Sequence, residues 1–195
     1  MSSKKLSTLL TTTFLALSLS IPLNTIQASD EVVNVYSARK EQLIKPLLND
    51  FTSLTGINVN LVTSKADALL KRLQTEGMNS QADLLITTDV GRLYRAKEAD
   101  VIQPAITPKL KKQVPVNLQD SENYWLGLTT RARVIVYAKD RVKPSELNTY
   151  EALAEPQWKK RLCIRSSNNI YNQSLVSSMI ANKGKQATTK WAEGL

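Results

Sequence analysis

Tyrosine, arginine, serine and acidic side chains stand close after apolar stretches of this sequence. Guanidinium groups and serine hydroxyls near helix N-termini suit a small oxyanion, while phenolates and a carboxylate are hard oxygen ligands for a highly charged cation. A phenol has an ordinary pKa of about 10, so a tyrosine becomes a ligand only where a strong Lewis acid such as ferric iron displaces its proton. The side chains in question are Tyr36, Ser37, Arg39, Lys40, Ser64, Asp89, Arg131, Arg133, Arg165, Ser166 and Tyr171.

The residue types argue against catalysis. The chain has no histidine and one cysteine, Cys163, which excludes Ser-His-Asp triads, His-ligated zinc, a Cys₄ zinc site and an internal disulfide. The set contains no pair of carboxylates, so acid/base hydrolysis is poorly supported. Binding is therefore favoured over turnover, and a secreted enzyme is a less favoured alternative.

Each candidate side chain also has a purely structural interpretation. Tyr36 could pack under a helix as a strand residue, and Tyr171 could do the same at the start of a helix. Arg131 and Arg133 could face solvent from one side of a strand. Asp89 could do no more than cap a helix. The residues alone therefore indicate a small-ligand-binding protein and leave the ligand open.

The elements that must position these residues alternate between β-like and helical patterns. The chain has 195 residues, 42% hydrophobic and 22% charged, which suits one domain or two small lobes. Strands are expected at 32–36, 57–62 and 83–87, each followed by a helix, at 43–54, 64–76 and 90–99. Ser64 with Asp67 resembles a capping box for the second helix. This order predicts an α/β fold with a parallel sheet, which binds ligands beyond the carboxyl ends of its strands.

The second half of the sequence is less regular. A segment rich in proline and lysine precedes a long extended run at 124–138, which we expect to be a strand that bridges two lobes. Helices are expected at 147–153, 170–181 and 186–193, and a further strand at 162–165.

The first 28 residues have the features of a secretory signal peptide. Lys4 and Lys5 precede a largely apolar stretch, and Ala28 is a small residue suited to cleavage. The stretch is interrupted by serine and threonine and falls short of the ~20 apolar residues that a membrane span needs. We therefore expect a free periplasmic protein with no membrane insertion after cleavage.

The positive charge suits an anionic ligand better than nucleic acid. The formal net charge is +9, and removal of the signal segment takes away two lysines and no acid, leaving +7. The basic residues are dispersed along the chain, and export disfavours a nucleic-acid partner.

Three runs of the sequence resemble the periplasmic ferric-iron-binding proteins of ABC importers. They are NVYSARKEQLIKPLL at 34–48, TSKADALLKRLQTEG at 63–77 and RARVIVYAKDRVKPSELNTYEALAEPQWKKRLCIRSSNNIYNQSLV at 131–176. The resemblance implies a type II periplasmic-binding-protein-like fold of two α/β lobes. It implies a first lobe at 29–128, a hinge or crossover strand at 129–139 and a partial second lobe at 140–195. The implied protein is a monomer without enzymatic activity that captures Fe³⁺ and delivers it to an inner-membrane ABC permease with its ATPase.

The resemblance also assigns roles to individual residues. Tyr171 matches a phenolate ligand, Tyr36 matches the N-terminal tyrosine that coordinates in tyrosine-rich members, and Asp89 matches a position where some members place a carboxylate ligand. With Tyr36 in one lobe and Tyr171 in the other, the two phenols are expected to meet at the ion when the hinge closes. The neighbourhood that holds a synergistic anion such as carbonate would include Arg131, Arg133, Ser64 and Arg39.

Two departures from the family pattern bear on the site. Many relatives have a histidine where this chain has Lys40, so an iron site here must be built from oxygen ligands and an anion. Family members are considerably longer, and their adjacent tyrosine pair would follow Leu195, so we expect the sequence to be a fragment or the product of an interrupted gene. An alternative keeps the same fold with another ligand, such as phosphate, sulfonate or another anion.

Overall fold

The computed structural model describes residues 31–195, which form one compact unit. The expected signal peptide lies outside the described residues. None of the helices in residues 31–195 has the length and hydrophobicity that crossing a membrane requires. The elements are β1 (Val32–Ser37), α1 (Glu41–Thr55), β2 (Asn58–Thr63), α2 (Ala66–Glu76), β3 (Leu84–Ile86), α3 (Val90–Glu98), α4 (Pro108–Gln113), α5 (Ile170–Lys183) and α6 (Lys185–Gly194), with short 3₁₀ turns η1 (Gly77–Asn79), η2 (Val116–Leu118), η3 (Pro144–Glu146), η4 (Glu151–Ala154) and η5 (Pro156–Trp158).

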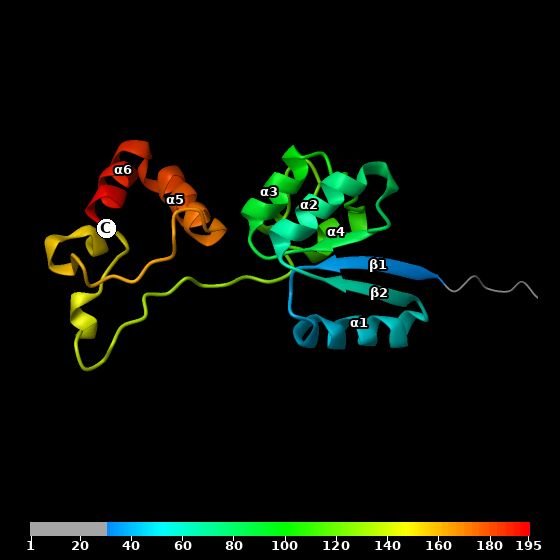
Figure 1. Cartoon of the computed structure of the whole chain (residues 1–195), viewed down its shortest axis with the longest axis horizontal. Helices are drawn as coiled ribbons and strands as arrows, with labels where there is room; N and C mark the ends of the chain where they lie inside the picture. Colours follow the sequence, from blue (N-terminus) through cyan, green and yellow to red (C-terminus); the bar gives the residue numbers. More distant parts are fainter. Residues whose placement is uncertain (1–30) are drawn as a thin grey trace, which may run out of the picture. The chain divides into compact units, whose positions relative to one another are not determined.

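The three strands form a parallel sheet in the order β2-β1-β3 (Figure 1). Val35 pairs with Leu61 on one side and with Leu84 on the other, so β1 is the central strand. The predicted α/β fold with a parallel sheet is confirmed. In the register of this sheet, the segments that follow Ser37, Thr63 and Ile86 leave from the same edge.

Local chemistry explains some of the helix ends and not others: α3 begins with a side-chain cap, whereas α1 and α2 begin without one. Gly56 ends α1 with a φ of 75°, the left-handed conformation that a residue with a Cβ adopts at a cost. α1 runs through Pro46. The expected capping box at Ser64 is wrong, because α2 begins after Lys65 and has no side-chain cap. Ser64 instead donates its backbone N–H to the carbonyl of Ser37.

Two of the predicted strands are absent from the structure. Residues 127–138 contain neither strand nor helix, and neither do residues 162–166 (Figure 1). The only isolated β-bridge recorded among residues 31–195 joins Gln119 to Leu126. An extended backbone becomes a strand only when a neighbour accepts and donates its ladder hydrogen bonds. The prediction of a crossover strand at 129–139 is therefore corrected: this segment is irregular, because the described residues supply no pairing partner for it.

The last part of the chain is helical around buried tryptophans. α5 and α6 pack on each other, and α6 also packs on η4. Trp158 and Trp191 are buried, and the Trp191 indole N–H donates to the carbonyl of Tyr150 at 2.7 Å. The predicted helices at 170–181 and 186–193 are confirmed. The expected helix at 147–153 is wrong, since the only helical element there is the 3₁₀ turn η4, which begins at Glu151.

The core beneath the sheet depends on two leucines of α2. Leu69 and Leu73 are buried beside Tyr36. We predict that Leu69→Ala lowers the free energy of unfolding by about 2–5 kcal/mol, because it leaves a cavity among close-packed side chains. Leu54→Ala is the control, since Leu54 is 86% exposed, and it should change stability by less than about 0.5 kcal/mol. Urea denaturation of the two variants measures the difference, and equal midpoints would contradict this account of the core.

Candidate functional site

The candidate site forms where the loop after β3 meets the start of α5. Gly91 lies in the first turn of α3, and a Cβ built there would come within 2.9 Å of the Ile170 side chain. The missing side chain lets α3 and α5 approach closely. α5 starts at Asn169, whose side chain accepts a hydrogen bond from the backbone N–H of Tyr171. This cap places Tyr171 in the first turn of the helix, facing the loop that ends β3.

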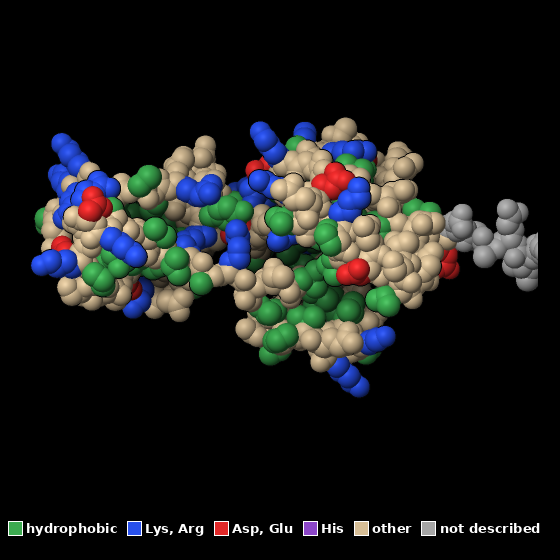
Figure 2. All heavy atoms as spheres, turned by 90° about the horizontal axis from the view of Figure 1, so that it is seen from below, with side chains coloured by type: hydrophobic (Ala, Val, Ile, Leu, Met, Phe, Trp, Pro, Cys, Tyr) green, Lys and Arg blue, Asp and Glu red, His purple; other side chains and the backbone are tan. Residues whose placement is uncertain are grey.

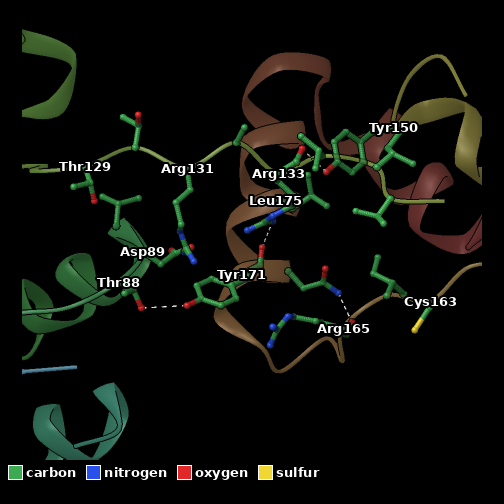
Figure 3. Close-up of a pocket in the computed structure, with 18 of the residues that line it drawn as sticks. Thr88, Asp89, Thr129, Arg131, Arg133, Tyr150, Cys163, Arg165, Tyr171 and Leu175 are labelled. Atoms are coloured by element: carbon green, nitrogen blue, oxygen red, sulfur yellow. Dashed lines mark hydrogen bonds between the residues drawn. The ribbon is translucent and has the colours of Figure 1, made fainter. Parts of the chain in front are cut away.

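The hydroxyl of Tyr171 is held by the loop after β3. Its oxygen lies 3.2 Å from Thr88 Oγ1, and either hydroxyl can be the donor (Figure 3). The two residues are 83 positions apart in the sequence. Tyr171 is therefore fixed by a tertiary contact, and its hydroxyl is directed toward the region beyond the carboxyl end of β3.

Guanidinium groups surround the Tyr171 ring. The Cζ atoms of Arg131, Arg165 and Arg92 lie 4.6, 5.2 and 5.7 Å from the ring centroid. Arg133 donates a hydrogen bond to the main-chain carbonyl of Tyr171. Figure 3 shows Arg131, Arg133 and Arg165 converging on this tyrosine from two irregular segments of the chain. Four arginines thus concentrate positive charge around one phenol.

This surrounding favours the ionised form of Tyr171. The Thr88 hydroxyl, which can donate to the phenolate oxygen, is the largest influence that lowers the pKa of Tyr171, and the charges of Arg131 and Arg92 lower it further. Partial burial opposes these effects without cancelling them. The positive end of α5 lies beside the same ring and acts in the same direction. A phenol held in this way loses its proton more readily to a Lewis acid than a free tyrosine does.

Asp89 has a structural role close to Tyr171, at the start of α3. As the N-cap of α3 it accepts a hydrogen bond from the backbone N–H of Gly91 at 3.1 Å. Its Oδ1 also accepts from the hydroxyl of Ser174, which ties α3 to α5. Both interactions use Oδ1, and among residues 31–195 no hydrogen bond to the other carboxylate oxygen is recorded.

A cavity of about 1540 Å³ lies beside Tyr171. Arg39, which was expected to bind an anion, lies on its wall. The other polar groups on the wall that are described above belong to Thr88, Asp89, Arg131, Arg133, Arg165 and Tyr171. Among residues 31–195 no group of three or more His, Cys, Asp or Glu side chains is placed to hold a metal ion. A metal bound here would therefore depend on phenolate oxygen and on an anion.

Tyr36 does not join Tyr171, and the expected meeting of the two phenols is corrected. Tyr36 is buried against Leu69, and its hydroxyl donates to Glu76 at 3.0 Å. Arg72 lies over its ring at 4.6 Å. Burial raises the pKa of Tyr36, and the hydrogen bond to the Glu76 carboxylate raises it further. A buried phenol with a raised pKa and a filled hydrogen bond is a poor metal ligand, as its purely structural interpretation predicted.

Ser64 is likewise separate from the site. Its side chain is exposed, and it is not among the residues that line the cavity. The analysis of the sequence also missed two contributors, Thr88 and Arg92. Arg92 links Tyr171 to the rest of the fold, because its guanidinium donates to the carbonyl of Thr88 and to Asp67. Thr88 lies in a loop that follows a predicted strand, and this position was the available signal; the position of Arg92 one turn into α3 carried none.

The family of bacterial extracellular solute-binding proteins matches residues 79–195. The chain belongs to this family. Like its matched relatives, this solute-binding protein combines a parallel sheet with flanking helices, and the type II periplasmic-binding-protein-like fold is confirmed.

Two solved structures resemble this solute-binding protein closely. One is a Trichodesmium protein, IdiA or FutA, in complex with iron and citrate ligands; the TM-score is 0.78 and the identity 47%, over 84% of this chain and 52% of that one. The other is ferric iron-binding protein A of Mannheimia haemolytica in an open conformation, with a TM-score of 0.75 and 43% identity over 85% and 52% of the two chains.

A relative found by sequence comparison shows a similar identity and a similar coverage. Iron uptake protein A1 of Synechocystis sp. is 47% identical over 173 residues, which are 89% of this chain and 48% of the relative. This solute-binding protein therefore spans about half the length of the relatives that it matches.

The arginines around Tyr171 should be measurable through its ionisation. We predict that Arg131→Gln raises the pKa of Tyr171, because the phenolate loses an adjacent positive charge. NMR titration of ¹³C-labelled tyrosine measures this, with Tyr171→Phe assigning the signal. Lys45→Gln is the matched control, since Lys45 is an exposed cation paired with Glu41 and lies outside the cavity lining. An equal shift in both variants would show that general charge, and not the local contact, sets the pKa.

Proposed function

We propose that this chain supplies part of a receptor that captures ferric iron for an ABC importer. The observation that carries the proposal is Tyr171, a phenol with a lowered pKa that lines the cavity and has four arginines around it. Ferric iron is a hard, trivalent acid that binds phenolate oxygen, and guanidinium groups hold the accompanying anion. The relatives support the choice of cargo, since the names of several of them state iron uptake or ferric iron binding.

Within the proposed site, the residues divide into ligand and anion groups. Tyr171 is the metal ligand, and the free carboxylate oxygen of Asp89 is the second candidate. Arg131 and Arg133 hold a synergistic anion such as carbonate, with Arg39 on the same wall. The described residues offer too few ligands for a complete iron shell, so the remaining ligands come from outside residues 31–195.

The proposed place of the protein follows from the same comparison. Extracellular solute-binding proteins carry their cargo outside the cytoplasm, and we expect a periplasmic receptor, exported by the segment at 1–28, that delivers to a membrane permease with its ATPase. We also propose that residues 29–128 belong to one lobe and 140–195 to the other, joined through 129–139. No catalytic step is assigned to it.

One observation favours a second candidate function. The arginines around Tyr171 would hold an anion without any metal, so the same cavity suits a receptor for phosphate, sulfonate or another anion. The difference between the two functions lies in whether the phenolate is used.

Visible spectroscopy tests the iron proposal on the chain itself. Titration with ferric citrate should produce a weak phenolate-to-iron charge-transfer band, weak because the shell is incomplete. Tyr171→Phe should abolish the band by removing the ligand oxygen. Tyr94→Phe is the matched control, since Tyr94 is 59% exposed and outside the cavity, and it should keep the band.

The result also separates the two functions. Iron and anions are titrated separately by calorimetry against the same three proteins. Anion binding that is unaffected by Tyr171→Phe, together with no band from ferric citrate, would support the anion receptor and overturn the iron proposal.

A further inference from the structure

Two side chains in the first part of α5 bind to α3 without reaching the cavity. The hydroxyl of Ser174 donates to Oδ1 of Asp89, the residue that caps α3. One position earlier, Oε1 of Gln173 accepts a hydrogen bond from Arg95 Nη2 at 2.6 Å. Neither Gln173 nor Ser174 is among the residues that line the cavity. Their side chains are therefore placed to act on a ligand only through other residues.

The spacing of these contacts follows the geometry of the two helices. Residues three or four positions apart share one face of a helix, and this relation holds for Gly91 and Arg95 in α3 and for Ile170 and Ser174 in α5. A Cβ at Gly91 would come within 2.9 Å of the Ile170 side chain and 3.3 Å of the Ser174 hydroxyl. The two helices thus meet closely on these faces (Figure 1).

Gln173 also holds the segment that carries Arg165. Its Nε2 donates to the carbonyl of Ser167 at 3.2 Å, so both ends of one amide group are bonded. The neighbouring Asn172 donates to the carbonyl of Arg165 at 2.6 Å. The guanidinium of Arg165 lies 5.2 Å from the centre of the Tyr171 ring. The Gln173 side chain therefore joins three parts of the chain that meet at the tyrosine: α3, α5 and the segment before α5.

The surroundings of Tyr171 need such restraints because their charges repel one another. Figure 2 shows lysine and arginine side chains gathered near the middle of one face of the molecule. Of the four arginines around Tyr171, only Arg92 forms a salt bridge within residues 31–195, to Asp67. Like charges at close range repel, and this repulsion tends to separate the segments that carry the arginines. Hydrogen bonds between those segments oppose the separation.

We propose that Gln173 and Ser174 are positioning residues for the Tyr171 site, which hold the first turn of α5 on α3 and so keep the phenol oxygen beside Thr88. A binding group acts well only where neighbouring hydrogen bonds fix its position closely. The inference rests on the proposed function for the identity of the bound ion, whereas the position of the phenol is a property of this chain alone.

NMR spectroscopy of the full chain tests the positioning without any metal. The contact should give a nuclear Overhauser effect between the Tyr171 ring and the Thr88 methyl group, and Tyr171→Phe assigns the tyrosine signal. Ser174→Ala removes the bond to Asp89, and Gln173→Met removes both bonds of the amide at a similar side-chain length. Each variant should lose the signal, because the first turn of α5 is then no longer held on α3.

Matched variants separate these contacts from general effects on the helices. Ser177→Ala and Gln186→Met make the same chemical changes at exposed positions of α5 and α6, and both should keep the signal. Arg95→Met breaks the bond to Gln173 from the side of α3 and should lose the signal. Arg95 is exposed, so this variant tests the contact even where a change within α5 disturbs folding. Circular dichroism of each variant checks its helix content.

Titration with ferric citrate measures what the position of the phenol contributes to binding. Ser174→Ala should weaken the affinity read from the phenolate-to-iron band by about fivefold, the fold-change expected from one ordinary hydrogen bond. Ser177→Ala should leave this affinity unchanged.

The outcomes separate positioning from iron binding. Absence of the contact signal from the unchanged chain, or its retention in Ser174→Ala, Gln173→Met and Arg95→Met, would overturn the proposal. Equal loss in the control variants would overturn it too, as would an unchanged affinity for iron in a variant that has lost the contact. Loss of the signal in the three variants alone, with no band from any protein, would count against the iron function and support the positioning.

Discussion

The contact between Thr88 and Tyr171 connects the two parts of the chain on which a ligand site depends. Thr88 ends the loop after β3, and Tyr171 begins α5, so one hydrogen bond joins the edge of the sheet to a helix from the far end of the sequence. Gly91 suits this contact, because a Cβ there would come within 2.9 Å of the Ile170 side chain, which would have to shift. Asp89 strengthens it by bonding both its own helix and Ser174. The candidate site therefore depends on contacts that hold two distant segments of the chain together.

Nearby charged and hydroxyl groups set how readily the tyrosine at this contact ionises. The arginines around Tyr171 come from α3 and from irregular segments. The Thr88 hydroxyl, together with Arg131 and Arg92, lowers the pKa of a phenol that burial alone would raise. Tyr36 shows the opposite balance, since burial and Glu76 raise its pKa and its hydroxyl is already bonded within the core. Two tyrosines of the same chain thus differ in how readily they ionise, for electrostatic reasons. Residue type predicted the chemistry that a phenol can do, but not which phenol is placed to do it.

Two segments with strand-like sequences are irregular because they lack pairing partners among the described residues. Residues 128–137 and 162–165 have strand-like sequences, yet neither finds a pairing partner within residues 31–195. Strand formation is a property of pairs, so a β-branched, apolar run stays irregular where its neighbour is absent. The apolar side chains of 128–137 are consequently exposed beside the Tyr171 cavity. Exposed apolar side chains and the groups around Tyr171 therefore line the same cavity.

The sequence by itself determined the parallel sheet, the three helices after its strands and the two helices near the end of the chain, because these depend on local periodicity, glycine and local order. The candidate role of Tyr171 came from the resemblance to a family and stays a prediction. Tertiary structure alone decided that Tyr36 belongs to the core, that Ser64 lies apart, and that Thr88 and Arg92 join the site. It also decided which predicted strands form. The direction of a side chain and the pairing of a strand depend on residues far away in sequence, and no local pattern records where those residues lie.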